Sequence, residues 1–382
     1  MRQSCKHPTI IVSMLLMWIF QSVSALAVEF VIVGPRAAGM GGAGVAVTTD
    51  SLATYWNPAG LAMERTFDIR GQASAQFTDR VGINQTIKDI NAINFSDTSL
   101  ANQARLQALI DKLASPYASV SAAGAVGLYF KGYSGDHYFG MNVSDVATGG
   151  TYMSTVDPTV TVVGGRLTNA SQVATRGLEA RQIGFSYAYA FLDRTLSLGA
   201  TVKVIQGAAY HKQRTLVGSS GNFDMSNLGK ATISTSYGID VGAVYRPVSW
   251  FQAGIVGKDL NAPEFDAPQG QKFQLNPQFR GGVAVKPYET LTLTADGDIN
   301  KNSTLVPTIK SRVISVGAEQ TLFSKGLALR AGAFKNVEDA NSYITPTAGL
   351  GVRLWAFSLD VGAGYDFRQR GALGSIALGF TW

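Results

Sequence analysis

The last 26 residues, 357–382, read FSLDVGAGYDFRQRGALGSIALGFTW. Apolar residues take every second position from Phe357 to Phe367 and again from Ile376 to Trp382, with mostly Ser, Asp, Gly or Thr between them. A period of two gives a β-strand one apolar face and one polar or small-residue face. Only Arg368–Arg370 separate the two predicted strands, 357–367 and 371–382, which leaves room for a tight turn. The end of the chain is therefore predicted to be a hairpin of two amphipathic strands.

The same alternation recurs upstream, in Tyr237–Arg246 and Leu291–Asn300. Only 15% of the residues are charged, against about 25% in soluble proteins. Beyond the first 30 residues, no apolar run approaches the roughly 20 residues of a membrane-spanning helix. A closed sheet satisfies its backbone hydrogen bonds inside a bilayer. We therefore predict an all-β fold, a transmembrane up-and-down antiparallel β-barrel. A secreted soluble β-protein would also alternate and stays as the weaker alternative.

About 14 strands can be counted, and the links between them alternate in length. The longer links are at 80–117, 147–178, 207–230, 260–275, 301–307 and 336–342. Outer-membrane barrels have an even strand count, short periplasmic turns and longer outer loops. The barrel domain, residues 65–382, is therefore expected to begin and end in the periplasm. Phe380 and Trp382 resemble the C-terminal assembly signal of outer-membrane proteins, which implies the barrel-assembly machinery as a partner and outer-membrane lipid as the surroundings.

Residues 1–27 have the features of a cleaved secretory signal peptide. Arg2 and Lys6 precede an apolar run, and Ala25–Ala27 fits the small-x-small cleavage pattern. Export places the predicted barrel in the bacterial outer membrane. The only cysteine, Cys5, leaves with the signal, so the mature chain is expected to have no disulfide and no cysteine metal site. The formal net charge of +6 falls to +4 without Arg2 and Lys6, which is too small to argue for a nucleic-acid partner.

Residues 31–47, VIVGPRAAGMGGAGVAV, contain the spacing Gly39-x-Gly41-x-x-Gly44 of a dinucleotide-binding loop. Such a loop needs a helix after the glycines and a returning parallel strand, but Asn57–Gly60 interrupts the segment. An exported protein also meets little nucleotide. We therefore predict no cofactor. Residues 28–64 are small and nearly uncharged, and we interpret them as a plug, because a barrel of about 14 strands is too wide for its own side chains to fill.

Residues 36–62, RAAGMGGAGVAVTTDSLATYWNPAGLA, resemble the N-terminal hatch of FadL-type outer-membrane barrels. Within that group they are most similar to TraF-type barrels, which are associated with plasmid conjugal transfer. The resemblance implies a hatch or ligand path made by Arg36, Gly39, Gly41, Gly42, Gly44, Asp50, Asn57, Pro58, Ala59 and Gly60.

Two functions follow from this resemblance. A FadL-type protein implies passage of hydrophobic small molecules across the outer membrane, with release by a hatch movement or a lateral wall opening. A TraF-type protein implies a structural or docking component of a conjugal transfer or secretion apparatus, without small-molecule transport. The Asn57-Pro58-Ala59 element then serves either the hatch or only the folding of the plug. The three histidines have neither metal-site spacing nor a visible catalytic partner, so we predict no enzyme and no metal.

The loops and charges carry further expectations. Leu106, Leu109, Ile110 and Leu113 have helical spacing, after Asp97 or Ser99 as a cap and before Pro116, so the first long loop is predicted to hold one helix. This helix either packs on the barrel rim or forms a surface that binds a partner or captures a ligand. The loop 147–178 is expected to hold a small hairpin, and His211 is expected to be a solvated loop residue. Four acids are expected to line the lumen and to pair with four arginines: Asp296, Asp298, Asp360 and Asp366 with Arg246, Arg280, Arg330 and Arg353.

Overall fold

A computed structural model describes residues 30–115, 118–217 and 228–382 of the 382-residue chain. The predicted signal peptide, residues 1–27, lies outside the described residues. No described helix is long and apolar enough to cross a membrane.

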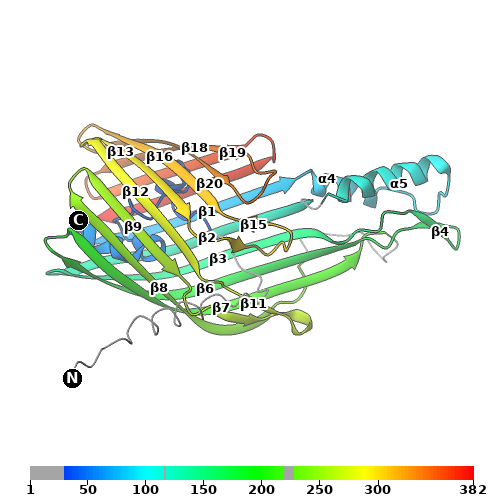
Figure 1. Ribbon diagram of the computed structural model, residues 1–382, viewed down its shortest axis with the longest axis horizontal. Helices are drawn as coiled ribbons and strands as arrows, with labels where there is room; N and C mark the ends of the chain where they lie inside the picture. The colour runs from blue at the N-terminus through cyan, green and yellow to red at the C-terminus, as the bar shows by residue number, and fades with distance from the viewer. Residues whose placement is uncertain (1–29, 116–117, 218–227) are drawn as a thin grey trace, which may run out of the picture.

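Fourteen antiparallel strands close into one barrel, which confirms the predicted fold class (Figure 1). Each barrel strand pairs with the previous and the next barrel strand along the chain, so the order is up-and-down. The strands are β1 (Asp68–Arg80), β2 (Ser119–Ser134), β3 (His137–Thr155), β6 (Gln172–Phe191), β7 (Leu196–Thr215), β8 (Thr232–Val248), β9 (Phe251–Lys258), β12 (Gln278–Tyr288), β13 (Leu291–Asp298), β16 (Val313–Leu322), β17 (Leu327–Asn336), β18 (Thr345–Leu354), β19 (Phe357–Asp366) and β20 (Gly371–Thr381).

The last strand closes the barrel on the first. β20 pairs with β1 from Asp68↔Thr381 to Phe77↔Ala372. The ladder continues beyond both strands, because Phe67 and Trp382 exchange backbone hydrogen bonds of 2.9 and 3.0 Å. Their rings stack at a centroid separation of 5.6 Å. The chain-terminal aromatic therefore completes the seam between the two ends of the barrel.

Alternation along each strand separates the two faces of the wall. On β6 the side chains of Ile183, Phe185 and Tyr187 are exposed on the outside, whereas Gln182 and Ser186, at the alternate positions, are buried. The same pattern on the other strands forms a continuous outer apolar belt. Exposure of so large an apolar area to water is unfavourable, whereas a bilayer covers it. The inner faces carry the polar and small residues that contact the plug.

The two ends of the barrel differ. The turn end, at the left of Figure 1, carries the short turns β2–β3, β6–β7, β8–β9, β12–β13, β16–β17 and β18–β19. The loop end, at the right, carries α4 (Ile83–Asn91), α5 (Leu100–Leu113) and the hairpin β4 (Thr161–Val163) to β5 (Arg166–Thr168). The predicted helix is α5 and the predicted hairpin is β4–β5, while α4 was not anticipated. These elements share an apolar cluster with the outer ends of β6 and β7, through Val173 and Leu216.

Several strands extend further toward the loop end than the sequence predicted. We expected loops at 147–178 and 207–230, but β3 runs to Thr155, β6 starts at Gln172 and β7 runs to Thr215. The outward face turns polar next to this stretch, where Arg181 pairs with both Asp145 and Glu179. The alternation between apolar and polar residues fades there although the hydrogen-bonded ladder continues. The expectation for His211 was therefore wrong, because it lies on β7 with only 7% of its surface exposed.

Two further hairpins lie against the inner wall near the loop end. One consists of β10 (Glu264–Asp266), η3 (Pro268–Gly270) and β11 (Lys272–Gln274), and the other of β14 (Asn302–Ser303) and β15 (Lys310–Ser311). Phe265 and Phe273 of the first pack on inward residues of β6 and β7, such as Leu178 and Ile205. The second packs on Tyr152 of β3 through apolar residues of its loop. Both hairpins narrow the lumen from the loop end.

Candidate functional site: the plug in the lumen

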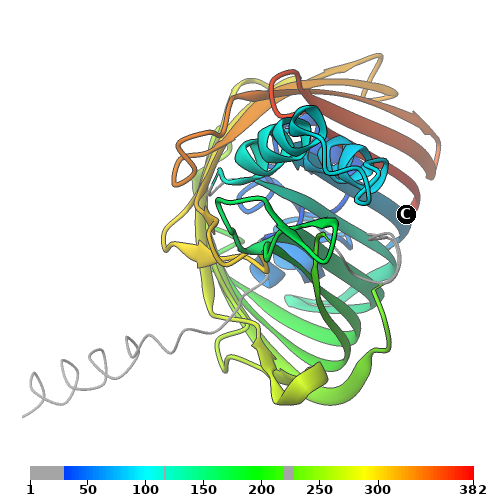
Figure 2. The ribbon, with the colours of Figure 1, turned by 90° about the vertical axis from the view of Figure 1, so that its right-hand side faces the viewer.

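The N-terminal segment lies inside the barrel, toward the turn end. Figure 2 looks in from the loop end and shows this blue segment enclosed by the ring of strands. Its elements are α2 (Pro35–Gly39), α3 (Ala53–Trp56) and η2 (Pro58–Met63). Most of its residues are buried, and Val33, Met40 and Trp56 have no exposed surface. The segment thus occupies the position expected of a plug.

Glycines allow the plug backbone to touch the wall backbone. A Cβ added to Gly39 would lie 2.9 Å from the Cα of Gly349 on β18, and a Cβ added to Gly349 would lie 3.1 Å from the Cα of Gly39. Gly41 has a φ of +69°, and a Cβ there would collide with backbone atoms of Ala333 on β17. Further wall glycines face plug atoms in the same way: Gly140, Gly199, Gly242, Gly254, Gly317, Gly332 and Gly362. These wall partners were not predicted from the sequence, although their place on the polar faces of alternating strands is a usable signal.

The predicted glycine loop holds a carboxylate of the protein itself. The amides of Gly44 and Val45 donate to one oxygen of Asp296 on β13, at 2.7 and 2.8 Å. These are the donors that a phosphate-binding loop would offer to a nucleotide. Because both amides already donate to Asp296, they are not free to bind the phosphates of a dinucleotide. Gly42 also has a positive φ, and a Cβ added there would lie only 2.9 Å from the side chain of Ile32 within the plug.

Asn57 joins three separate segments. Its side chain has no exposed surface, and its amide donates to Val45 O of the plug and Ala243 O of β8, both at 3.2 Å. Its side-chain oxygen accepts from the amide of Ala59 at 3.2 Å and so caps η2, in which Pro58 takes the first position. Ser197 of β7 donates to Ala59 O at 2.8 Å. The adjacent Gly60 packs on Thr48 O, where a Cβ would collide.

An ionic chain with both ends on the plug crosses the lumen, and this set of side chains is called the clamp below. Arg36 binds Glu319 of β16 at 2.7 and 3.0 Å. The chain continues Glu319–Arg330 and Arg330–Asp360, each at 2.7 Å, and Asp360–Arg70 at 3.3 Å. Arg70 then reaches Asp50 of the plug at 3.4 Å and Asp68 of β1 at 3.2 Å. Asp68 in turn accepts from the amide of Ser51 at 2.9 Å. The plug is therefore fixed to four strands by charge-assisted contacts.

The electrostatics of the two plug residues in the clamp follow from burial and neighbours. Burial alone would lower the pKa of Arg36, but Glu319 outweighs this and raises the pKa above its usual value. Burial raises the pKa of Asp50, and Arg70 only partly offsets this effect. Arg36 therefore stays charged, and Asp50 holds a proton more readily than an exposed aspartate does.

The predicted acid–arginine pairs are half confirmed. Asp298 pairs with Arg280 at 3.2 Å, and Asp360 pairs with Arg330. The prediction was wrong for the other two acids: Asp296 binds the plug amides, and Asp366 accepts from the amides of Arg368 and Gln369. It was also wrong for the other two arginines, because Arg246 donates to Met63 O and Arg353 donates to Thr381. Alternation assigned these residues to the lumen but could not show which of them the plug would contact.

Aromatic residues of the plug face the loop end of the lumen. Phe30 packs on Tyr55 and Trp56 at centroid separations of 5.8 and 5.1 Å. Tyr55 and Trp56 donate to Val31 O and Val33 O, each at 2.8 Å, so the rings are held in place. The ammonium of Lys258, on β9, lies 3.3 Å from the Tyr55 ring centroid. Neither Phe30 nor Lys258 was predicted from the sequence, because the cation–π contact joins residues about 200 positions apart.

A small lumen cavity of about 50 Å³ joins the plug to the hairpin above it. Its apolar lining consists of Phe30 and Val31 on the plug side and of Leu178, Ala180 and Leu275 from the cluster beneath β10–β11. Its polar lining includes Lys203, Asp240, Lys258 and Asp259. A hollow of about 560 Å³ lies on the outer wall at the same height, beside Ala147, Gly149 and Gly177. At the turn end a polar cavity of about 250 Å³ opens beneath the plug and is lined by the clamp.

The remaining predicted site residues lie at the seam. Phe380 is on β20 and packs edge-on against Phe357 at 4.8 Å, and its ring lies 5.0 Å from that of Trp382. The aromatic end of the chain is thus part of the girdle at the turn end. Nothing in this geometry tests its role in assembly, which stays a prediction.

Comparison with known proteins gives one family and a set of related folds. The family model described as "F plasmid transfer operon, TraF, protein" matches residues 54–298, more than half of the chain. No curated protein matches the sequence.

Three solved structures share the fold. The Pseudomonas putida toluene transporter TodX is 14% identical with a TM-score of 0.54, over 94% of this chain and 99% of that one. The Ralstonia pickettii toluene transporter TbuX is 15% identical with a TM-score of 0.52, over 91% and 97%. A Pseudomonas aeruginosa FadL homologue is 13% identical with a TM-score of 0.56, over 94% and 99%. At such identities the likeness establishes the FadL-type barrel fold alone.

Proposed function

This chain belongs to the family of the F plasmid transfer operon TraF protein, and on that premise we propose that it is an outer-membrane barrel that passes hydrophobic small molecules through a plugged lumen. The outer apolar belt and the fold shared with transporters support the placement of the barrel in the outer membrane. The turn end then faces the periplasm, as in other outer-membrane barrels.

One observation carries the proposal. The lumen cavity bordered by Phe30, Leu178 and Leu275 connects the apolar cluster of the plug to the apolar cluster beneath the inward hairpin β10–β11. A water-filled porin has a polar interior instead. Apolar side chains form one side of this cavity, and Lys203, Asp240, Lys258 and Asp259 lie on the other. We propose that an apolar solute follows the apolar side, where burial of its surface stabilises it.

Release toward the periplasm requires the plug to move. At the turn end every neighbouring pair of barrel strands is hydrogen-bonded, so the wall around the plug offers no gap between strands there. The plug residues below the cavity are buried, and the clamp fixes them to the wall. We therefore propose that the clamp sets the free energy of plug displacement and so limits the rate of passage.

Uptake by intact cells tests this function. Cells that express the full chain are expected to accumulate radiolabelled toluene several-fold faster than cells with an empty vector, while maltose permeation stays unchanged. Equal toluene uptake in both strains, with the barrel recovered in heat-modifiable form from the outer membrane, would overturn the proposal.

A second candidate function is a structural or docking role in a conjugal transfer apparatus. The family match itself favours it, because the matched residues include the projecting α4, α5 and β4–β5 at the loop end. Deletion of residues 83–113 is expected to lower transfer frequency and to leave toluene uptake unchanged if this role holds. Unaltered transfer would count against it.

A further inference from the structure

The basic residues that line the cavities at the turn end fall into two groups. Deep in the cavity beneath the plug, Arg36, Arg70 and Arg330 each contact at least one carboxylate of the clamp. Nearer the opening, four basic residues form no ion pair within the described part of the chain: Arg246, Lys286, Lys325 and Arg353. Two acids lie among them, Glu64 and Glu289, so this set of four, called the rim below, has a surplus of two positive charges. The clamp beneath it has three arginines and four carboxylates, which leaves one positive charge in excess over the whole cavity lining.

The rim comes from four separate hairpins. Arg246 precedes the β8–β9 turn, Lys286 the β12–β13 turn and Arg353 the β18–β19 turn, while Lys325 lies in the β16–β17 turn. Arg246 and Lys286 both line a smaller cavity of about 40 Å³ at the turn end, together with Ala284 of the wall and Val47 of the plug. Lys286, Lys325 and Arg353 line the 250 Å³ cavity. The rim therefore surrounds the inside of the opening and does not face lipid.

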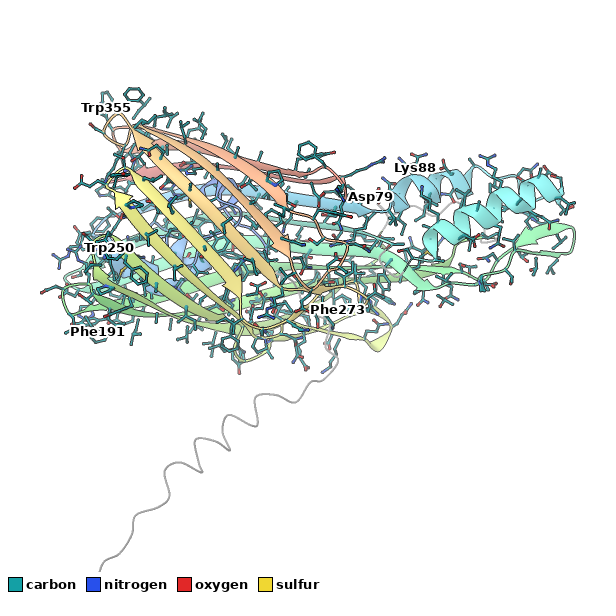
Figure 3. All side chains as sticks on the ribbon, turned by 45° about the horizontal axis from the view of Figure 1, so that its top comes forward. Asp79, Lys88, Phe191, Trp250, Phe273 and Trp355 are labelled. Carbon is teal, nitrogen blue, oxygen red and sulfur yellow. The ribbon has the colours of Figure 1, made fainter. Side chains whose placement is uncertain are left out.

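Each of these four hairpins also presents one large apolar residue at its tip. The exposed fractions are 57% for Trp250, 70% for Tyr288, 82% for Phe323 and 97% for Trp355. Figure 3 shows Trp250 and Trp355 at the same end of the barrel. Basic groups inside the opening and apolar groups at its edge thus recur on four turns in succession.

We infer that the rim and its four apolar tips form a docking site for an acidic protein segment that contains apolar residues, supplied by a partner on the turn-end side. A concave, partly desolvated opening with unpaired basic groups concentrates the positive potential and attracts an acidic chain. The exposed aromatics supply the apolar contacts on which such interfaces depend. Phospholipid headgroups fit less well, because the basic groups line the cavity and not the outer wall.

This site is next to the clamp. The hairpins β16–β17 and β18–β19 carry rim residues at their turns, and β16 and β17 also carry Glu319 and Arg330 of the clamp. A segment seated on the rim therefore contacts the hairpins that hold the plug. The inference does not depend on passage of hydrophobic molecules and extends beyond it.

A defined peptide tests the site. The full-length barrel is placed in nanodiscs of phosphatidylcholine, and the probe is a fluorescein-labelled peptide of six glutamates and two leucines. Fluorescence anisotropy is expected to show binding that weakens as salt rises. The variant Lys286→Gln/Lys325→Gln/Arg353→Gln is expected to bind at least about tenfold more weakly, since each tenfold step is only about 1.4 kcal/mol. The matched control Lys88→Gln/Arg105→Gln/Lys112→Gln removes the same charge from the helices at the loop end and is expected to bind as the native protein does.

Several results would overturn the inference: no binding by the native barrel, equal binding by the rim variant, or equal binding of a six-lysine probe. If vesicles of phosphatidylglycerol displace the labelled peptide by binding to the rim, the site would instead be assigned to lipid. Heat-modifiable mobility checks folding, and the single variant Lys325→Glu, at an exposed turn position, serves if the triple variant does not fold. Toluene uptake is measured separately, so failure of either proposal can be told from failure of the other.

Discussion

The guanidinium of Arg36 on the plug makes two hydrogen bonds to the carboxylate of Glu319 on β16, at 2.7 and 3.0 Å. The same carboxylate also binds Arg330 at 2.7 Å. The acid is thus shared between the plug and the wall. Because Arg330 would still neutralise Glu319 if Arg36 left, the plug has a contact that can break without stranding a buried charge.

Arg36→Gln is therefore expected to loosen the plug without unfolding the barrel. A hydrogen bond to a charged group contributes about 1.5–3 kcal/mol, and we take about 1.4 kcal/mol because the Arg36 side chain is 25% exposed. The population with a displaced plug is then expected to rise roughly tenfold, seen as more frequent conductance steps in a planar bilayer. Arg65→Gln is the control, because its pair with Asp136 is exposed. Conductance steps no more frequent than those of the native protein would show that Arg36 does not hold the plug.

A methyl group at Gly41 is expected to disturb the plug more than one on an open part of the wall. Gly41→Ala introduces both an unfavourable φ and a collision with Ala333, costing about 1–3 kcal/mol. Gly297→Ala on β13 is the matched control, because no atom lies within 4 Å of the added methyl. Limited proteolysis of the purified barrel compares them, with faster cleavage of the N-terminal segment expected only for Gly41→Ala. Equal cleavage rates for the two variants would argue against close packing at Gly41.

Asn57→Asp is expected to be more damaging than Asn57→Ala. The aspartate keeps the shape but replaces the amide donor with a carboxylate that faces Val45 O and Ala243 O. Alanine removes the donor without adding a charge, so its cost is about 1–3 kcal/mol, as for other lost buried hydrogen bonds. The midpoint of guanidinium unfolding is expected to fall in the order native, Asn57→Ala, Asn57→Asp. An aspartate variant as stable as the native protein would mean that these contacts do not stabilise the plug.

Trp382→Ala is expected to weaken closure of the barrel. The change removes the stacking on Phe67, and aromatic pairs contribute about 0.5–1.5 kcal/mol beyond burial. The heat-modifiable fraction recovered from outer membranes is expected to fall, whereas Trp355→Ala at an exposed turn leaves it unchanged. The prediction fails if the two variants are recovered equally.

The barrel could be predicted from the sequence because two of its features depend only on residues that are close together along the chain. Alternation along Phe357–Phe367 defines the faces of a strand, and link length defines the two ends. The limits of β3, β6 and β7 were missed because strands that leave the bilayer lose the alternation but keep their backbone pairing. The plug was predicted from small residues and from Asn57-Pro58-Ala59. Its contacts were not, because Arg36–Glu319 and Asp296–Gly44 join residues about 250 or more positions apart, and only the three-dimensional register brings them together.

Passage of an apolar solute past Ala180 is the central claim. Toluene uptake by cells that produce Ala180→Trp, which fills the lumen cavity, is compared with uptake by Ile183→Trp, which adds the same ring to the outer face of the same strand. Leu178→Phe serves as a milder filling variant, and heat-modifiable mobility confirms that all three are folded. We predict that Ala180→Trp lowers uptake to the level of the empty vector, Leu178→Phe lowers it partly, and Ile183→Trp leaves it unchanged. Native uptake by folded Ala180→Trp would contradict the account.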